Sequence, residues 1–313
     1  MPAEADESPR PAGTDLEGLE GLEGLEGLDL ELGYRDRTVV HGAGITLRAG
    51  RVTALVGPNG SGKSTLLRAL ARLHRPAAGS LRLGGVTAVD ALALSRRDFA
   101  RRVTLLAQSR PTPAGLTVAD VVGFGRHPYR GRLRGGDPEG AAAVARALRV
   151  TGLAELPGRP VDELSGGQLQ RVWLASCLAQ DAGVLLLDEP TTFLDLRFQV
   201  EMLDLVRDLA DDDGVAVGLV LHDLDHAAAV ADEVVLLADG HVRGCGPPAA
   251  VLTGDLLTDV YGIRVDVDHD RHTGALRTRP VGRHPARAAV TDPPAPITPA
   301  PDATGPGPAE GAP

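Results

Sequence analysis

Short apolar runs alternate along the chain with longer segments of helical periodicity. Residues 51–56 (RVTALV) lead through a glycine-rich loop into the helix-like 66–74 (LLRALARLH), and 184–187 (VLLL) and 215–221 (VAVGLVL) are further apolar runs. Continuous apolar runs of about four to eight residues are typical of strands buried on both faces of a parallel sheet. The pattern therefore predicts an α/β fold in which such strands alternate with helices.

The pattern changes to helices between Gln108 and Ser165. Thr117 can cap a helix over 118–125, and a second helical run at 139–150 (EGAAAVARALRV) ends near Gly152. We therefore expect a helical subdomain, at about 109–165, inserted into the strand-and-helix body.

Both ends of the chain differ in composition from this body. Residues 1–27 contain a Leu-Glu-Gly repeat, whose period of three matches neither a helix nor a strand, and residues 281–313 are rich in proline. We predict that both segments are disordered and that the folded body spans 28–280.

Charge and composition exclude several classes of protein. Residues 1–32 hold ten acidic residues and one arginine, so −9 of the net charge of −10 lies there and the body is nearly neutral. A neutral body argues against a nucleic-acid partner. The absence of an apolar run of about 18 residues and of a signal sequence predicts a cytoplasmic protein, and two cysteines are too few for a disulfide framework.

A phosphate-binding motif follows the first of the apolar runs. Gly57, Gly62, Lys63 and Ser64 fit G-x-x-x-x-G-K-[ST] between a predicted strand and a predicted helix, which is the context this motif requires. Its backbone N–H groups cradle phosphates, the lysine reaches the β and γ phosphates and the serine holds Mg²⁺. Lys63 is also the only lysine beside 31 arginines, which indicates a position where a guanidinium cannot serve.

A pair of carboxylates follows a later apolar run. In 184–189 (VLLLDE), Asp188 can hold the metal shell and Glu189 can orient and deprotonate an attacking water. Alone, such a pair is more often a helix cap or a solvated loop, but beside the phosphate motif it predicts hydrolysis of ATP with Mg²⁺.

A Ser-Gly-Gly segment precedes this pair by some twenty residues. Together with the phosphate motif, Leu164, Ser165, Gly166, Gly167 and Gln168 (LSGGQ) resemble the signature of the ATP-binding-cassette (ABC) ATPase family. The resemblance implies a P-loop core of the ABC ATPase type with an inserted helical subdomain and an antiparallel β portion near the N-terminus. It also implies a homodimer in which the signature of one copy closes over ATP held by the other.

The resemblance carries further roles to single positions. It implies that Tyr34 stacks on adenine, that Gln108 senses Mg²⁺ and the permease, that Asp195 lies at the dimer contact and that His222 is the switch histidine at the γ-phosphate. The implied ATP-binding set is Tyr34, Gly57, Pro58, Asn59, Gly60, Ser61, Gly62, Lys63, Ser64, Thr65 and Gln108. The implied metal ligands are Ser64, Gln108 and Asp188, and the implied catalytic residues are Lys63, Glu189 and His222.

Two longer segments narrow the resemblance to one branch of the family. Residues 116–130 (LTVADVVGFGRHPYR) and 251–262 (VLTGDLLTDVYG) are similar to importer ATPases for iron–siderophore complexes, heme or cobalamin. Asp225 departs from this branch, which commonly shows asparagine there. The resemblance implies an ATPase on the inner face of the cell membrane, bound to a permease that works with an extracytoplasmic substrate-binding protein.

Three alternatives stay open beside this interpretation. The chain can serve an importer of another solute, such as a free metal ion. A soluble ABC ATPase of translation or DNA repair is a second alternative, although those resemble tandem or coiled-coil-split cassettes and this chain has one cassette. The third is a nucleotide-binding regulator without turnover, which should lack Glu189 or His222.

Overall fold

A parallel sheet forms the centre of the protein. In the computed structural model, residues 24–282 are described except for 36, 85–87, 109, 111, 131–135 and 193. The strands of this sheet have the order β10-β9-β3-β8-β7-β6, and β9, β3, β8, β7 and β6 are parallel, whereas β10 is antiparallel to β9. Their bounds are β3 (Val52–Val56), β6 (Val103–Leu106), β7 (Val184–Asp188), β8 (Ala216–Val220), β9 (Glu233–Ala238) and β10 (His241–Gly246). The apolar runs at 51–56, 184–187 and 215–221 thus form adjacent strands, as the sequence predicted.

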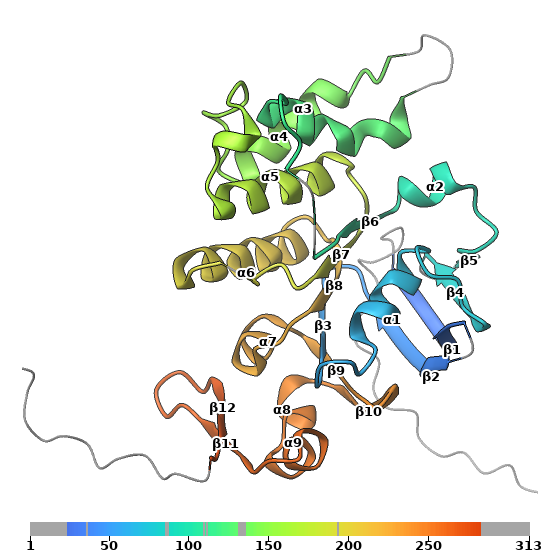
Figure 1. Cartoon of the computed structure of the whole chain (residues 1–313), viewed down its shortest axis with the longest axis vertical. Helices are drawn as coiled ribbons and strands as arrows, with labels where there is room; N and C mark the ends of the chain where they lie inside the picture. Colours follow the sequence, from blue (N-terminus) through green and yellow to red (C-terminus); the bar gives the residue numbers. More distant parts are fainter. Residues whose placement is uncertain are drawn as a thin grey trace, which may run out of the picture.

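A second, antiparallel sheet covers one side of the molecule (Figure 1). It consists of β1 (Leu25–Tyr34), β2 (Arg37–Leu47), β4 (Ala78–Leu83) and β5 (Val89–Asp90), in the order β2-β1-β4-β5. Helix α1 (Lys63–Leu70) packs between the two sheets, because its Leu66, Leu67 and Leu70 share a core with Leu32 of β1 and Leu55 of β3. The antiparallel β portion expected near the N-terminus is confirmed.

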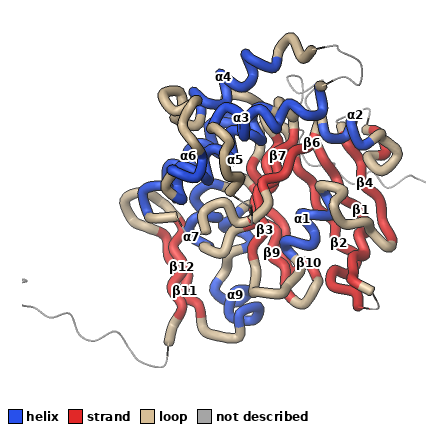
Figure 2. Tube along the Cα trace, turned by 45° about the horizontal axis from the view of Figure 1, so that its top comes forward, coloured by secondary structure: helices blue, strands red, loops and turns tan. Residues whose placement is uncertain are grey.

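The opposite face of the central sheet is covered by later helices (Figure 2). They are α6 (Leu196–Asp211), α7 (Leu224–Val230), α8 (Pro248–Val251) and α9 (Gly254–Tyr261), and the hairpin β11 (Val265–His269) and β12 (Leu276–Pro280) follows them. Because both faces are covered, every residue of β3, β7 and β8 is buried.

The remaining helices form a layer of their own at the end of the molecule near β6 (Figure 1). They are α3 (Val118–Val122), the 3₁₀ turns η1 (Gly123–Tyr129) and η2 (Val161–Glu163), α4 (Gly140–Val150) and α5 (Gly166–Ala179), whereas the short α2 (Arg96–Ala100) lies outside this layer and packs its Phe99 into the core shared by the two sheets. Thr117 caps α3 through a reciprocal capping box, and Val118 and Leu148 share a core with Val172 of α5. The helical layer therefore includes α5, beyond the predicted limit at 165.

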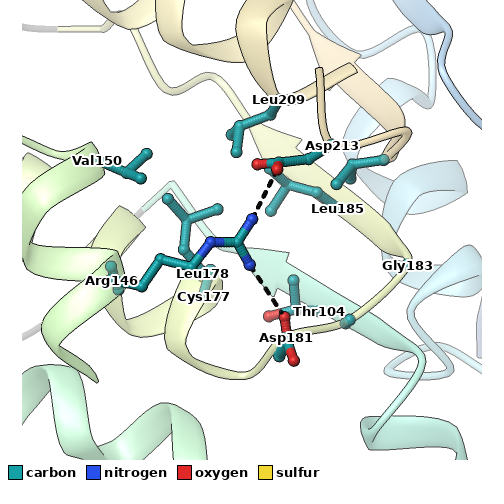
Figure 3. Close-up of a pocket in the computed structure, with 13 residues that line it drawn as sticks. Thr104, Arg146, Val150, Cys177, Leu178, Asp181, Gly183, Leu185, Leu209 and Asp213 are labelled. Carbon is teal, nitrogen blue, oxygen red and sulfur yellow. Dashed lines mark hydrogen bonds and ion pairs between the residues drawn. The ribbon is translucent and has the colours of Figure 1, made fainter. Parts of the chain in front are cut away.

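Arg146 ties the helical layer to the core. Its guanidinium lies between the carboxylates of Asp213, at 2.6 Å, and Asp181, at 3.5 Å (Figure 3).

Another ionic contact fixes the start of β3. There Asp232 accepts from the Val52 N–H at 2.8 Å and pairs with Arg207 of α6 at 2.8 Å.

The N-terminal boundary differs from the prediction. Residues 1–23 of the acidic repeat lie outside the described residues, but β1 begins at Leu25, which is 1% exposed and pairs with Leu47 and Leu83. The expected boundary at 28 is therefore wrong, because pairing on both sides of the strand and not the local repeat decides where the fold begins. At the other end β12 stops at Pro280, and residues 283–313 of the predicted tail lie outside the described residues.

No helix in the described part of the chain has the length and apolar character needed to cross a membrane.

Candidate active site

The loop between β3 and α1 has a backbone that only glycine can supply. Gly57, Gly60 and Gly62 have φ of +142°, +79° and +105°. A Cβ on Gly57 would lie 1.9 Å from the carbonyl oxygen of Leu237, and one on Gly62 would lie 2.6 Å from Val40. At Gly60 a Cβ would meet no described atom within 4 Å, so this part of the loop faces open space.

Lys63, the first residue of α1, lies inside this loop. Its side chain is buried, and its ammonium donates to the carbonyl oxygens of Gly57, at 2.8 Å, and Pro58, at 2.9 Å. Burial lowers its pKa, and the nearby carboxylates of Glu189 and Asp188 oppose that shift. Since an ammonium has three donors, one remains for a phosphate oxygen beside the loop.

Ser64 and Asp188 meet at the end of β7. The Ser64 hydroxyl donates to Asp188 Oδ1 at 2.8 Å, and Asp188 is 1% exposed. Burial raises the pKa of this carboxyl, against the hydrogen bond from Ser64. Its buried Oδ2 has no hydrogen-bond partner among the described residues, and Arg68 of α1 lies 3.7 Å from it.

Glu189 is held by side chains from separate parts of the chain. His222 Nε2 lies 2.6 Å from Oε1, while Gln108 Nε2 and, at 3.3 Å, the Thr192 hydroxyl donate to Oε2. Its backbone has φ of +54°, a region that costs a non-glycine residue about 1 kcal/mol or more. The protein thus keeps Glu189, directly after β7, in an unfavourable backbone conformation while three side chains hold its carboxylate.

The structure thus brings together six of the predicted residues, which come from four segments of the sequence: Lys63, Ser64, Gln108, Asp188, Glu189 and His222. Of the other loop residues, Asn59 is exposed, and the buried Ser61 hydroxyl has no hydrogen-bond partner among the described residues. Thr65 lies half-buried in the first turn of α1.

The signature residues stand apart from this cluster. Ser165 caps α5 through a reciprocal capping box with Gln168, Ser165 and Gly166 are exposed, and Leu164 packs on the helical core. Among the described residues, no hydrogen bond or ion pair joins this segment to Lys63 or Glu189. The other predicted dimer residue, the exposed Asp195, caps α6 by accepting from the Phe198 N–H at 3.0 Å.

Tyr34 lies at the end of β1 and is 48% exposed. Its ring is 4.6 Å from the ring of His74, beyond the C-terminal end of α1, whereas Lys63 starts that helix. The structure therefore does not join Tyr34 to the cluster, and its predicted stacking on adenine stays a prediction.

Sequence reasoning missed several contacts of this site. Arg68 is four residues after Ser64 on α1, so helical spacing could have indicated that it reaches Asp188. Gln170 of α5 donates to the carbonyl oxygen of Pro190 at 3.0 Å, next to Glu189, and no sequence motif indicates this contact.

Comparison with known proteins gives the family. Residues 40–192 match the ABC transporter family. The chain is 39% identical over 254 residues to the ferric enterobactin transport ATP-binding protein FepC of Escherichia coli K12, covering 81% of this chain and 93% of the relative. It is 40% identical over 244 residues to the iron(3+)-hydroxamate import ATP-binding protein FhuC of Bacillus subtilis 168, with coverage of 78% and 90%.

A solved structure supports the same assignment. It is an inward-facing conformation of a transporter assigned to the metal-chelate ABC type, with a TM-score of 0.71 at 25% identity, covering 83% of this chain and 98% of that chain. The chain belongs to the family of ABC transporter ATP-binding subunits, and it is an ATPase, as the sequence predicted.

Proposed function

We propose that this chain powers the uptake of an iron–siderophore complex through a membrane permease, as a homodimer on the cytoplasmic face. The relatives that share about 40% identity over most of the chain carry ferric enterobactin and iron(3+)-hydroxamate in their names, which supports the cargo class. Heme, cobalamin or a free metal ion are alternative cargoes. The single observation that supports ATP hydrolysis by this site is that His222, Gln108 and Thr192 all contact the carboxylate of Glu189.

The geometry supports a division of labour among the side chains. Lys63 binds the phosphates through its remaining donor, and Glu189 accepts the proton of the water that attacks the γ-phosphorus. His222 and Gln108 hold the Glu189 carboxylate in place, so loss of either should lower the rate of hydrolysis more than the affinity for ATP.

The residues beside Lys63 fit a magnesium ion. Ser64 and Asp188 offer a hydroxyl and a carboxylate, the hard oxygen ligands that Mg²⁺ prefers, and Asp188 Oδ2 is buried without a hydrogen-bond partner among the described residues. Ser64 and Asp188 would hold the metal together with Gln108, whose amide lies on the neighbouring Glu189. When bound, Mg²⁺ neutralises part of the charge on the phosphates.

Exposed groups of the monomer support the dimer. The N-terminus of α5 is capped by Ser165 but open to solvent at Gly166, so its helix dipole can receive phosphate from a second copy. Asp195, also exposed, lies at the start of α6, next to the segment that follows Glu189.

A groove between α1 and the helical layer supports contact with the permease. It has a volume of about 1030 Å³, and its described lining residues include Arg72, Arg75, Arg96 and Arg110 and no acidic residue. Burial lowers the pKa of Arg110 to about 10, and its Nη1 and the indole N–H of Trp173 are buried without hydrogen-bond partners among the described residues. These donors and positive charges favour a permease segment that presents carboxylates.

The exposed apolar side chains of this groove also support contact with a partner. Leu73 is 70% exposed and Phe124 is 46% exposed, and both line the groove. Exposed apolar side chains beside unpaired donors are typical of a surface that a partner covers.

Uptake by cells that lack the gene tests the proposal. Wild type should restore uptake of ⁵⁵Fe-labelled siderophore and Lys63→Ala should not, whereas restored cobalamin uptake instead would assign the other cargo. Arg96→Glu should abolish co-purification with a permease while the ATPase activity of the isolated chain persists, and Arg149→Glu, an exposed arginine outside the groove, is the matched control. Co-purification of Arg96→Glu at the wild-type level would contradict docking in this groove.

A further inference from the structure

The segment from α9 to β12 (residues 254–280), here called the C-terminal unit, lies beside the active site although no motif of the family occurs in β11 or β12. Figures 1 and 2 show its hairpin against α7. Leu257 and Val265 are buried and share a core with Leu221, the residue before His222. The unit is therefore packed against the segment that carries the switch histidine.

Asp225 makes the polar contact between the unit and α7. Its Oδ1 accepts from the backbone N–H of Thr278 at 2.7 Å and from the Thr278 hydroxyl at 2.8 Å, and Arg277 lies 3.5 Å from Oδ2. The carboxylate thus joins the first turn of α7 to β12 through both kinds of donor of one residue. Asn would keep an acceptor oxygen for Thr278 but not the ion pair with Arg277.

The contact of Asp225 with Thr278 lies close in sequence to the proposed catalytic residues, because Asp225 is only three residues after His222. Asp223 caps α7 by accepting from the His226 N–H at 2.9 Å, and His222 directly precedes that cap. Since His222 lies 2.6 Å from Glu189, a shift of the first turn of α7 would move the partner of that carboxylate.

A second contact joins the same unit to the phosphate loop. Tyr261 is the last residue of α9, and the backbone N–H of Gly57 beside its phenol opposes the rise in pKa that burial causes. Gly57 also accepts from Lys63 through its carbonyl. The C-terminal unit therefore lies close to the phosphate loop and also contacts the first turn of α7, which follows His222.

We propose that Asp225, held by Thr278 of the C-terminal unit, is a positioning residue that fixes His222 against Glu189. The inference rests on the proposed roles of His222 and Glu189 in hydrolysis. It assigns β11 and β12 a part in turnover in addition to their packing.

Steady-state ATP hydrolysis by the full-length chain tests this assignment. Asp225→Ala should lower kcat by about tenfold or more with little change in KM for ATP, because misplacement of a positioning group affects the rate and not the phosphate loop. Asp225→Asn should retain most of the activity, since it keeps an acceptor for Thr278.

Asp266→Ala is the matched control. Asp266 of β11 pairs with Arg264 at 2.9 Å and with Arg279 at 2.8 Å, and within the described part of the chain it makes no ion pair with α7, so its loss should perturb the hairpin alone. It should hydrolyse ATP like wild type. Equal losses of kcat in Asp225→Ala and Asp266→Ala, accompanied by equal falls in Tm, would show a purely structural role and overturn the proposal.

A double-mutant cycle with His222 distinguishes the positioning role of Asp225 from the proposed role of His222 in hydrolysis. If Asp225 acts through His222, Asp225→Ala should have no further effect in a His222→Ala background. A further drop by the full factor would refute action through the histidine, as would wild-type kcat in Asp225→Ala beside an impaired His222→Ala. Normal hydrolysis by His222→Ala would instead refute the proposed function of the switch histidine, and the positioning role with it.

Discussion

Replacement of Glu189 by glutamine should separate nucleotide binding from hydrolysis. The two side chains have the same shape, and the glutamine oxygen can still accept from Gln108 and Thr192 while its amide nitrogen faces His222. What it loses is the ability to accept a proton from water. Hydrolysis should therefore fall by a factor of about 10² to 10⁴, equivalent to about 2.7 to 5.4 kcal/mol at the barrier.

The assay measures phosphate release together with binding of a fluorescent ATP analogue in the presence of Mg²⁺. The variant should bind the analogue with a Kd within about threefold of wild type, since Lys63, Ser64 and Asp188 are untouched. Glu155→Gln, at an exposed glutamate outside the site, should behave as wild type. Normal hydrolysis by Glu189→Gln would refute the assignment of the general base.

The same variant tests the dimer. Because uncleaved ATP should remain between the phosphate loop of one copy and Ser165–Gln168 of the other, Glu189→Gln should accumulate as a dimer with ATP and Mg²⁺ but not with ADP and Mg²⁺. Light scattering at micromolar protein concentration distinguishes the two states. An inactive variant that stays monomeric with ATP would leave the base assignment intact and refute dimerisation without the permease.

Lys63→Arg should abolish turnover and weaken ATP binding, because a guanidinium fork does not fit inside the loop; hydrolysis near the wild-type rate would contradict this. Removal of residues 1–23 should leave stability to urea unchanged, whereas removal of 1–27 also deletes the buried Leu25 and should cost about 2 to 5 kcal/mol, so equal stability of the two proteins would show that β1 does not need it. Asp232→Asn should cost about 1 to 3 kcal/mol at pH 7. Desolvation acts to raise the pKa of Asp232, but its hydrogen bonds to two arginines and a backbone N–H leave it below 3.8, so this stability is present above pH 3.8 and is lost as pH falls through the lowered pKa. Thermal unfolding from pH 7 down to pH 3 should show a steeper loss in wild type than in the variant, and parallel curves would refute this account.

The local motifs of the site could be predicted because each of them demands a particular backbone. The positive φ of Gly57 and Gly62 and the lack of space beside them admit no other residue, so the glycine spacing identifies the loop. The capping box of Ser165 with Gln168 likewise follows from neighbours in sequence. In both cases the residues that determine the geometry lie within a few positions of one another.

Contacts between distant segments could not be predicted in this way. The start of β1 depends on pairing with strands about twenty and sixty residues away, and the contact of Asp225 with Thr278 spans 53 positions. Single-sequence patterns carry no signal for such pairs. For the same reason, the aspartate at position 225 looked like a departure from the family pattern, and only the structure shows the side chain that it holds.

The composition of the chain acquires a physical explanation at Lys63. Arginine supplies every other side-chain cation except histidine, and its planar fork can reach two acceptors, as that of Arg207 does with Asp211 and Asp232. Inside the phosphate loop, two carbonyl oxygens converge on one point at 2.8 and 2.9 Å. A compact ammonium satisfies both and keeps a donor for phosphate, whereas the N–H groups of a planar guanidinium are spread over a fork that suits acceptors lying side by side. A compositional bias that replaced lysine elsewhere therefore stops at the position where the shape of the cation decides function.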